Sequence, residues 1–133
     1  MRTVIMTETA DEIEQFVHEY AEKFSTADPE VIATHFHEPA TLLTGDGAIV
    51  LERRADVEIL FTEILDGLRE RDYDFSEVGD LDVEVLGPDR ARATVEWIRY
   101  TTTGEELEHL VATHLFRRTE DGWKMAVLAP HED

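Results

Sequence analysis

The sequence contains no cysteine and no long run of apolar residues. The absence of cysteine excludes disulfides, thiolate metal ligands and cysteine nucleophiles. The N-terminal stretch MRTVIMTETADE lacks the apolar segment of a signal peptide, and nothing downstream approaches the roughly eighteen apolar residues of a membrane span. We therefore expect a cytoplasmic protein that does not associate with membranes.

Basic residues are also scarce. Twelve lysines and arginines stand against 31 aspartates and glutamates, which gives a formal net charge of −19, and Lys23 and Lys124 are the only lysines. A surface of this sign repels nucleic acid and anionic membranes. Such a coat usually serves solubility, although adaptation to high intracellular salt would give the same composition.

The length and the apolar content favour one folded domain over residues 1–133. A chain of 133 residues buries a real core without disulfides or metals. Hydrophobic residues make up 42% of the chain and recur with clear periods, which argues against disorder despite the high charge.

Residues 9–26 have the pattern of an amphipathic helix. Thr9 and Glu12 fit a capping box at its start. The apolar residues recur three and four positions apart and form one stripe: Ile13, Phe16, Val17, Tyr20, Ala21 and Phe24.

A second, short helix is predicted to follow Asp28, which fits an N-cap with Pro29 in the first turn. This helix cannot run far, because Pro39 disfavours helical conformation at the residue before it. We expect its last turn and exit at residues 35–37, HFH in the sequence.

The rest of the pattern is one more helix and a set of strands. Short β-prone runs at 41–44 and 48–51 flank Gly45-Asp46-Gly47, a strong hairpin signal. A third amphipathic helix is predicted over 54–71, with no evident N-cap. From residue 73 the apolar period becomes two, and strands are expected at 73–86, 90–102, 105–118 and 122–129.

Helices therefore precede the long strands instead of alternating with them, as in the α+β class. We expect a curved antiparallel sheet with the three helices of the N-terminal half packed on its concave face.

The sequence resembles the nuclear transport factor 2-like (NTF2-like) superfamily, also called cystatin-like, and within it the SnoaL-like and ketosteroid-isomerase-like small proteins. The resemblance spans nearly the whole chain. It rests on ADPEVIATHFHEPATLLTGDG after an amphipathic helix, on the third helix, and on THLFRRTEDGWKMAVL as the closing strands. It implies a cone-shaped sheet around a pocket that the helices close, and a homodimer formed through the sheet.

The resemblance to ketosteroid isomerases also suggests positions for catalytic groups. It places the hydrogen-bonding tyrosine of the first helix at Tyr20, the general-base aspartate at Thr44 and the protonated aspartic acid at Thr113. Only the tyrosine is retained. A threonine hydroxyl cannot remove a proton near neutral pH, so isomerisation by that mechanism is not expected here.

His109 is a candidate base in place of the missing carboxylates. It lies four residues from Thr113, so alternation puts both on one strand face together with Val111, and an imidazole in an apolar cavity is a candidate base. His114 has the opposite parity and is expected on the outer face of the sheet or at a subunit contact. Tyr20 also fits an ordinary core aromatic, and His109 an exposed residue near a strand end.

The resemblance implies a wider pocket wall around these groups. Its expected residues are Phe16, Tyr20, Phe36, Leu42, Thr44, Val111, Thr113, Val127 and His131.

His35 and His37 invite a metal-site interpretation. Two residues apart at a helix end, their side chains diverge by roughly 200°, which is poor geometry for one ion. A third ligand such as Glu38 or Asp46 would have to come from the hairpin. We expect neither a metal nor another cofactor.

Two classes of function remain open. The first is a pocket protein that binds a small, largely apolar molecule, with acid-base chemistry such as isomerisation, dehydration or cyclisation by Tyr20 and His109. The second is a non-catalytic module that dimerises or interacts through its convex sheet and keeps a residual cavity. Neither involves nucleic acid or a membrane.

Overall fold

The computed structural model describes residues 2–26 and 28–131, with the side chains from residue 8 onward. The elements in chain order are α1 (Arg2–Ser25), α2 (Pro29–Ala33), β1 (Phe36–Thr44), β2 (Gly47–Leu51), α3 (Arg54–Glu70), β3 (Tyr73–Gly87), β4 (Arg90–Thr101), β5 (Glu106–Thr119) and β6 (Gly122–His131). The helices and strands expected from the sequence are all present, and the α+β class is confirmed. Within the described part of the chain, no helix has both the length and the apolarity needed to span a membrane.

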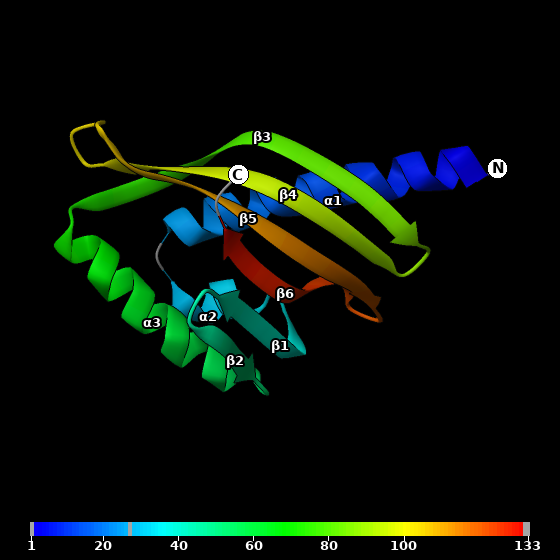
Figure 1. Ribbon diagram of the computed structural model, residues 1–133, viewed down its shortest axis with the longest axis horizontal. Coiled ribbons are helices and arrows are strands. Elements are labelled where there is room, and N and C mark those ends of the chain that lie inside the picture. Colours follow the sequence, from blue (N-terminus) through cyan, green and yellow to red (C-terminus); the bar gives the residue numbers. More distant parts are fainter. Residues whose placement is uncertain (1, 27, 132–133) are drawn as a thin grey trace.

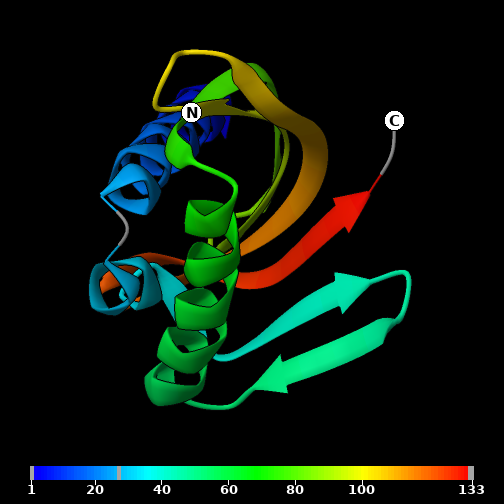
Figure 2. The ribbon, with the colours of Figure 1, turned by 90° about the vertical axis from the view of Figure 1, so that its left-hand side faces the viewer.

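The six strands form one sheet in the order β2-β1-β6-β5-β4-β3. Neighbouring strands are antiparallel except β1 and β6, which run parallel. The sheet curves without closing, and the three helices lie on its hollow side (Figures 1 and 2). The parallel pairing was not predicted, because it joins two segments that are far apart in the sequence.

The first helix begins well before the expected start. It extends back to Arg2, and Thr9 lies inside it with a relative exposure of 1%. The predicted capping box at Thr9 is therefore wrong. Neither glycine nor proline occurs between Arg2 and Thr9, so nothing in that stretch stops the helix from continuing.

The second helix begins as predicted but ends earlier. The Asp28 carboxylate accepts a hydrogen bond from the backbone N–H of Glu30 at 3.0 Å, and the helix ends at Ala33. Phe36 already opens strand β1, paired with Met125 of β6, so the expected helical exit over 35–37 is wrong. The segment from residue 36 is extended because its backbone pairs with β6, which is distant in the sequence.

The cap of α3 comes from another element. The Glu38 carboxylate on β1 accepts a hydrogen bond from the backbone N–H of Arg54 at 2.7 Å. Within the local sequence, the Asp56 carboxylate accepts from the N–H of Arg53 at 3.1 Å. Both carboxylates also face the positive end of the helix dipole. Local inspection could not identify the first of these caps, because its donor and acceptor are sixteen residues apart.

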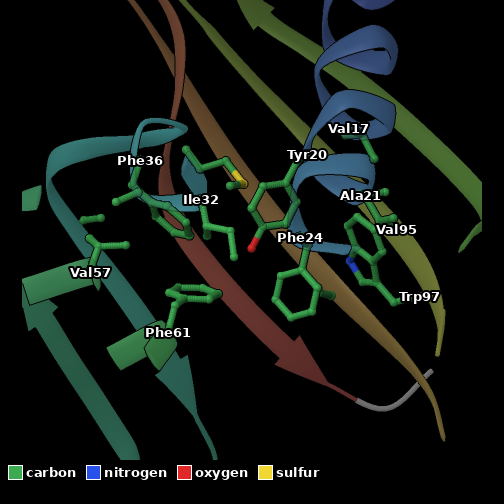
Figure 3. Packing of buried hydrophobic residues seen from close by; sticks show 14 of the residues in the cluster. Val17, Tyr20, Ala21, Phe24, Ile32, Phe36, Val57, Phe61, Val95 and Trp97 are labelled. Carbon is green, nitrogen blue, oxygen red and sulfur yellow. The ribbon is translucent and has the colours of Figure 1, made fainter. Parts of the chain in front are cut away.

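The core fills the space between the helices and the hollow side of the sheet. Tyr20 lies at the centre of this core and packs edge to face against Phe36 and Trp97 (Figure 3). The buried aromatic residues are Tyr20, Phe24, Phe36, Phe61, Tyr73, Trp97, Phe116 and Trp123. Such edge-to-face pairs add roughly 0.5–1.5 kcal/mol each beyond the burial of their area.

Candidate functional site

A cavity of about 220 Å³ remains inside this aromatic core. Every long element contributes to its wall, which is mostly apolar. The lining residues are Tyr20 and Phe24 of α1; Leu42 and Thr44 of β1; Phe61 and Ile64 of α3; Ser76 of β3; Trp97 and Arg99 of β4; Leu110, Ala112 and His114 of β5; and Leu128 and Pro130 of β6. A larger hollow between α1 and β3 is an open surface depression, so we take the deeper cavity in the core, which is only partly open to solvent, as the candidate site.

The sequence-based assignment of the faces of β5 is wrong by one residue. Leu110, Ala112 and His114 face the cavity, whereas Val111 and Thr113 alternate with them and face outward. A shift of one residue along a strand exchanges its two faces. Both faces of this strand carry apolar residues and one histidine, so alternation alone did not distinguish them.

Three polar residues predicted for the pocket, His109, Thr113 and His131, lie on the outer face instead and make polar contacts there. His109 lies 3.0 Å from the Glu96 carboxylate, measured from Nε2. The hydroxyl of Thr113 and Nε2 of His131 are hydrogen-bonded at 2.8 Å. None of the three lines the cavity. Val127 also lies on the outer face, opposite Leu115 in the register of β5 and β6.

Two other predicted pocket residues belong to the core beside the cavity. Phe36 is buried, and its ring centroid lies 5.2 Å from that of Phe61. Phe16 packs against the rings of His35 and Phe116. They support the residues that line the cavity and do not line it themselves.

Tyr20 lies on the cavity wall, as predicted from the resemblance. Its side chain is 5% exposed, and Figure 3 shows its hydroxyl pointing toward the space between Phe24 and Phe61. Among the described residues, none makes a hydrogen bond to this hydroxyl. Burial raises the pKa of Tyr20, and the nearby positive charge of Arg99 opposes that shift only in part. The phenol therefore stays protonated at neutral pH and is available as a hydrogen-bond donor.

Thr44 also reaches the cavity, at the end of β1. Its hydroxyl accepts a hydrogen bond from the backbone N–H of Asp46 at 3.2 Å, so it stabilises the hairpin turn. Tyr20, Leu42 and Thr44 are thus brought together as expected, while Thr113 is not.

His114, expected on the outer face, is instead buried at the cavity wall. The indole N–H of Trp97 donates to its Nε2 at 3.2 Å, and its Nδ1 lies 3.1 Å from the sulfur of Met125. Because an indole can only donate, Nε2 is the acceptor and Nδ1 carries the proton. Burial lowers the pKa of His114 to about 3, so the ring is neutral and its lone pair is already used.

Arg99 is the functional candidate that the sequence analysis missed. It follows Trp97 by two positions on β4 and therefore shares its inward face, which is the signal that could have identified it. Its guanidinium carbon lies 5.3 Å from the centroid of the Phe24 ring. Its Nη1 is hydrogen-bonded to the Glu108 carboxylate.

The carboxylate of Glu108 compensates the positive charge of Arg99. Burial alone would raise the pKa of its carboxyl, but the hydrogen bond and charge of Arg99, together with Arg71, hold that pKa below its usual range. Arg71 reaches the second oxygen of the carboxylate at 3.4 Å. Arg99 of the cavity wall therefore belongs to a cluster of two cations and one anion, whose other members, Arg71 and Glu108, lie outside the lining.

The buried imidazole predicts a specific pH dependence. Below about pH 6.5 the unfolded chain protonates His114, whereas the folded chain does not until about pH 3. The free energy of unfolding should therefore fall more steeply with acidification in the wild type than in His114→Gln, by about 1 kcal/mol per pH unit between pH 6 and 4. Urea unfolding at several pH values measures this. Parallel pH profiles would contradict it, because the carboxylates common to both proteins cancel.

Comparison with solved structures identifies proteins of the same fold. An NTF2-like protein with a cystatin-like fold from Novosphingobium aromaticivorans has a TM-score of 0.78 and 19% identity, over 97% of this chain and 84% of that chain. A Streptomyces avermitilis protein, provisionally named a dehydratase of the NTF2-like family, has a TM-score of 0.74 and 18% identity, over 96% and 97%. An uncharacterised protein with a cystatin-like fold from Caulobacter vibrioides has a TM-score of 0.72 and 21% identity, over 92% of this chain and 88% of that chain. At these identities the similarity is one of fold.

Sequence comparison adds the family. Among curated proteins, none matches the chain. A family model described as NTF2-like protein (DUF6841) matches residues 11–133, which covers all the described strands and most of the helices. The resemblance inferred from the sequence is thus confirmed, and the chain belongs to this family of NTF2-like proteins.

Proposed function

We propose that the cavity binds a small, largely apolar molecule and that the Tyr20 hydroxyl donates a hydrogen bond to it. The observation that carries this proposal is the hydroxyl of a buried tyrosine that has no hydrogen-bond partner among the described residues and lies at the wall of a cavity of about 220 Å³. An acceptor on a ligand would give this hydroxyl a hydrogen bond, which is worth about 0.5–1.5 kcal/mol net. Pockets for drug-sized ligands are about 300–1,000 Å³, so the ligand proposed here is smaller.

The cavity supports binding better than proton abstraction. Its described lining includes no aspartate or glutamate, and the Nε2 lone pair of His114 is occupied by Trp97. A general base needs an available carboxylate or imidazole. If isomerase, dehydratase or cyclase chemistry occurs, Tyr20 would polarise a carbonyl or hydroxyl as an acid. His109, on the outer face, is not part of this proposal.

Filling the cavity should abolish binding. We predict that Leu110→Trp removes the binding of small neutral probes such as cyclohexanone and indole, because the larger side chain occupies the cavity. The matched control is His109→Trp, whose new ring lies on the opposite face of the same strand and should leave binding unchanged. Methyl NMR shifts of Leu42, Ile64 and Leu128 on titration measure occupancy. Probes that shift none of these methyl groups in the wild type would refute the proposal.

Removing the Tyr20 hydroxyl should weaken ligand binding without destabilising the fold. We predict that Tyr20→Phe binds benzaldehyde several-fold more weakly and toluene equally well, with the free energy of unfolding unchanged or slightly higher, because no described residue is hydrogen-bonded to this hydroxyl. Tyr73→Phe is the control. Its hydroxyl is hydrogen-bonded to Ser76 at 2.6 Å, so its loss should cost about 1 kcal/mol of stability. A comparable loss in Tyr20→Phe would show that this hydroxyl is already paired in the protein.

We also propose that the protein forms a homodimer through the outer face of the sheet. Support comes from the apolar side chains there that remain partly exposed in a single chain: Ile98, Leu115 and Val127. Leu115 and Val127 are direct cross-strand partners, so they form a contiguous apolar surface. The high negative charge would oppose association, and more strongly at low salt.

Sedimentation velocity tests the dimer. We predict that Leu115→Arg shifts the protein to the monomer, because a buried unpaired charge at the interface is costly. Ile59→Arg is the control, since Ile59 is 63% exposed on α3, away from that face. A wild-type protein that sediments as a monomer at moderate salt and at all concentrations would rule out the dimer.

A further inference from the structure

The head group of the ligand can be inferred from Arg99. Among the described residues that line the cavity, Arg99 carries the one charged side chain, and 19% of that side chain is exposed. Its guanidinium carbon lies over the Phe24 ring, 5.3 Å from the centroid. Phe24 and Glu108 thus position this side chain at the cavity wall.

One edge of this guanidinium has no partner in the described part of the chain. Nη1 bonds to Glu108, while Nε is buried and unpaired and no described residue accepts from Nη2. The Nε–H and one N–H of Nη2 project in parallel from the same edge. Two parallel donors at that spacing match the two oxygens of a carboxylate.

The local charge also favours an anion. Arg99 and Arg71 share the single carboxylate of Glu108, so this cluster carries one excess positive charge in a chain whose formal net charge is −19. A neutral carbonyl would engage one donor and leave that excess charge uncompensated. A carboxylate would engage both donors and balance the charge.

We infer that the ligand is a small apolar monocarboxylic acid, whose carboxylate binds the Nε–Nη2 edge of Arg99 while its hydrocarbon part lies among the apolar lining. This inference rests on the proposed function of the cavity. Tyr20 lines the same cavity as Arg99 and would supply a further donor to the bound acid. The hydrocarbon would then extend toward Leu110 and Ala112.

Calorimetric titration with matched pairs of acid and amide tests the ligand class. The probes are benzoate against benzamide and hexanoate against hexanamide, at pH 7.5. We expect the wild type to bind each acid about tenfold or more tightly than its amide, as for a charge-assisted pair of hydrogen bonds. Arg99→Gln should lose this preference and keep its affinity for the amides. Arg71→Gln, which also removes one cation beside Glu108 but does not line the cavity, should change the preference less than about threefold.

A further variant protects the test against misfolding. Arg99→Gln leaves Glu108 partly buried without its main partner, so Arg99→Gln/Glu108→Gln, which removes both charges, should show the same lost preference. Amides that bind the wild type as well as the acids would overturn the ligand class and leave the cavity function standing. If neither series binds, both proposals fail. An equal loss in Arg71→Gln and Arg99→Gln would assign the preference to general charge and overturn the role of Arg99.

Discussion

The register between β4 and β5 is the constraint on which the site depends. Trp97 stands opposite Leu110, and Val95 opposite Ala112, so these side chains and their alternating neighbours all face the helices. A displacement of one residue would move His109 and Thr113 inward and place His114 in solvent. The buried pair of Trp97 and His114 fixes this register, because its hydrogen bond forms only when both residues face inward.

The polar groups that line the cavity differ in whether they are free to bind a ligand. The indole of Trp97, the imidazole of His114 and the sulfur of Met125 bond to one another and leave nothing for a ligand. The phenol of Tyr20 and one edge of Arg99, in contrast, have no protein acceptor among the described residues. A ligand that enters would therefore meet available donors at Tyr20 and Arg99 within a lining that is mostly apolar, which favours one orientation as well as one chemistry.

Much of the fold could be predicted from local sequence, and much less of the site. The Asp28 cap, the hairpin at Gly45-Asp46-Gly47 and the period-two strands are local signals, and each appears in the structure. The start of β1 and the cap of α3 depend on Met125 and Glu38. These partners are distant in the sequence, and no local pattern reports them.

The site residues illustrate the same limit. Tyr20 and Thr44 could be placed by resemblance, because helix stripes and turns fix where they lie. His114 could not, because its placement needs the absolute face of β5, which carries apolar residues on both faces. Arg99 was missed for another reason. An arginine two positions after a tryptophan was a usable signal for the inward face, yet arginine on so acidic a chain is more simply explained as a surface partner of carboxylates.

The contact between Glu38 and Arg54 has an evolutionary consequence. This hydrogen bond joins the two ends of the segment that contains the β1–β2 hairpin, and Figure 2 shows the tip of that hairpin projecting away from the helices. Lengthening a loop whose ends are held together costs little, since each doubling of the loop length adds only about 0.6 kcal/mol of closure entropy. Thr44, beside the hairpin turn, lines the cavity, so insertions at the tip would change the cavity wall while α3 and the rest of the sheet keep their positions. Related chains could therefore bind different ligands on the same scaffold.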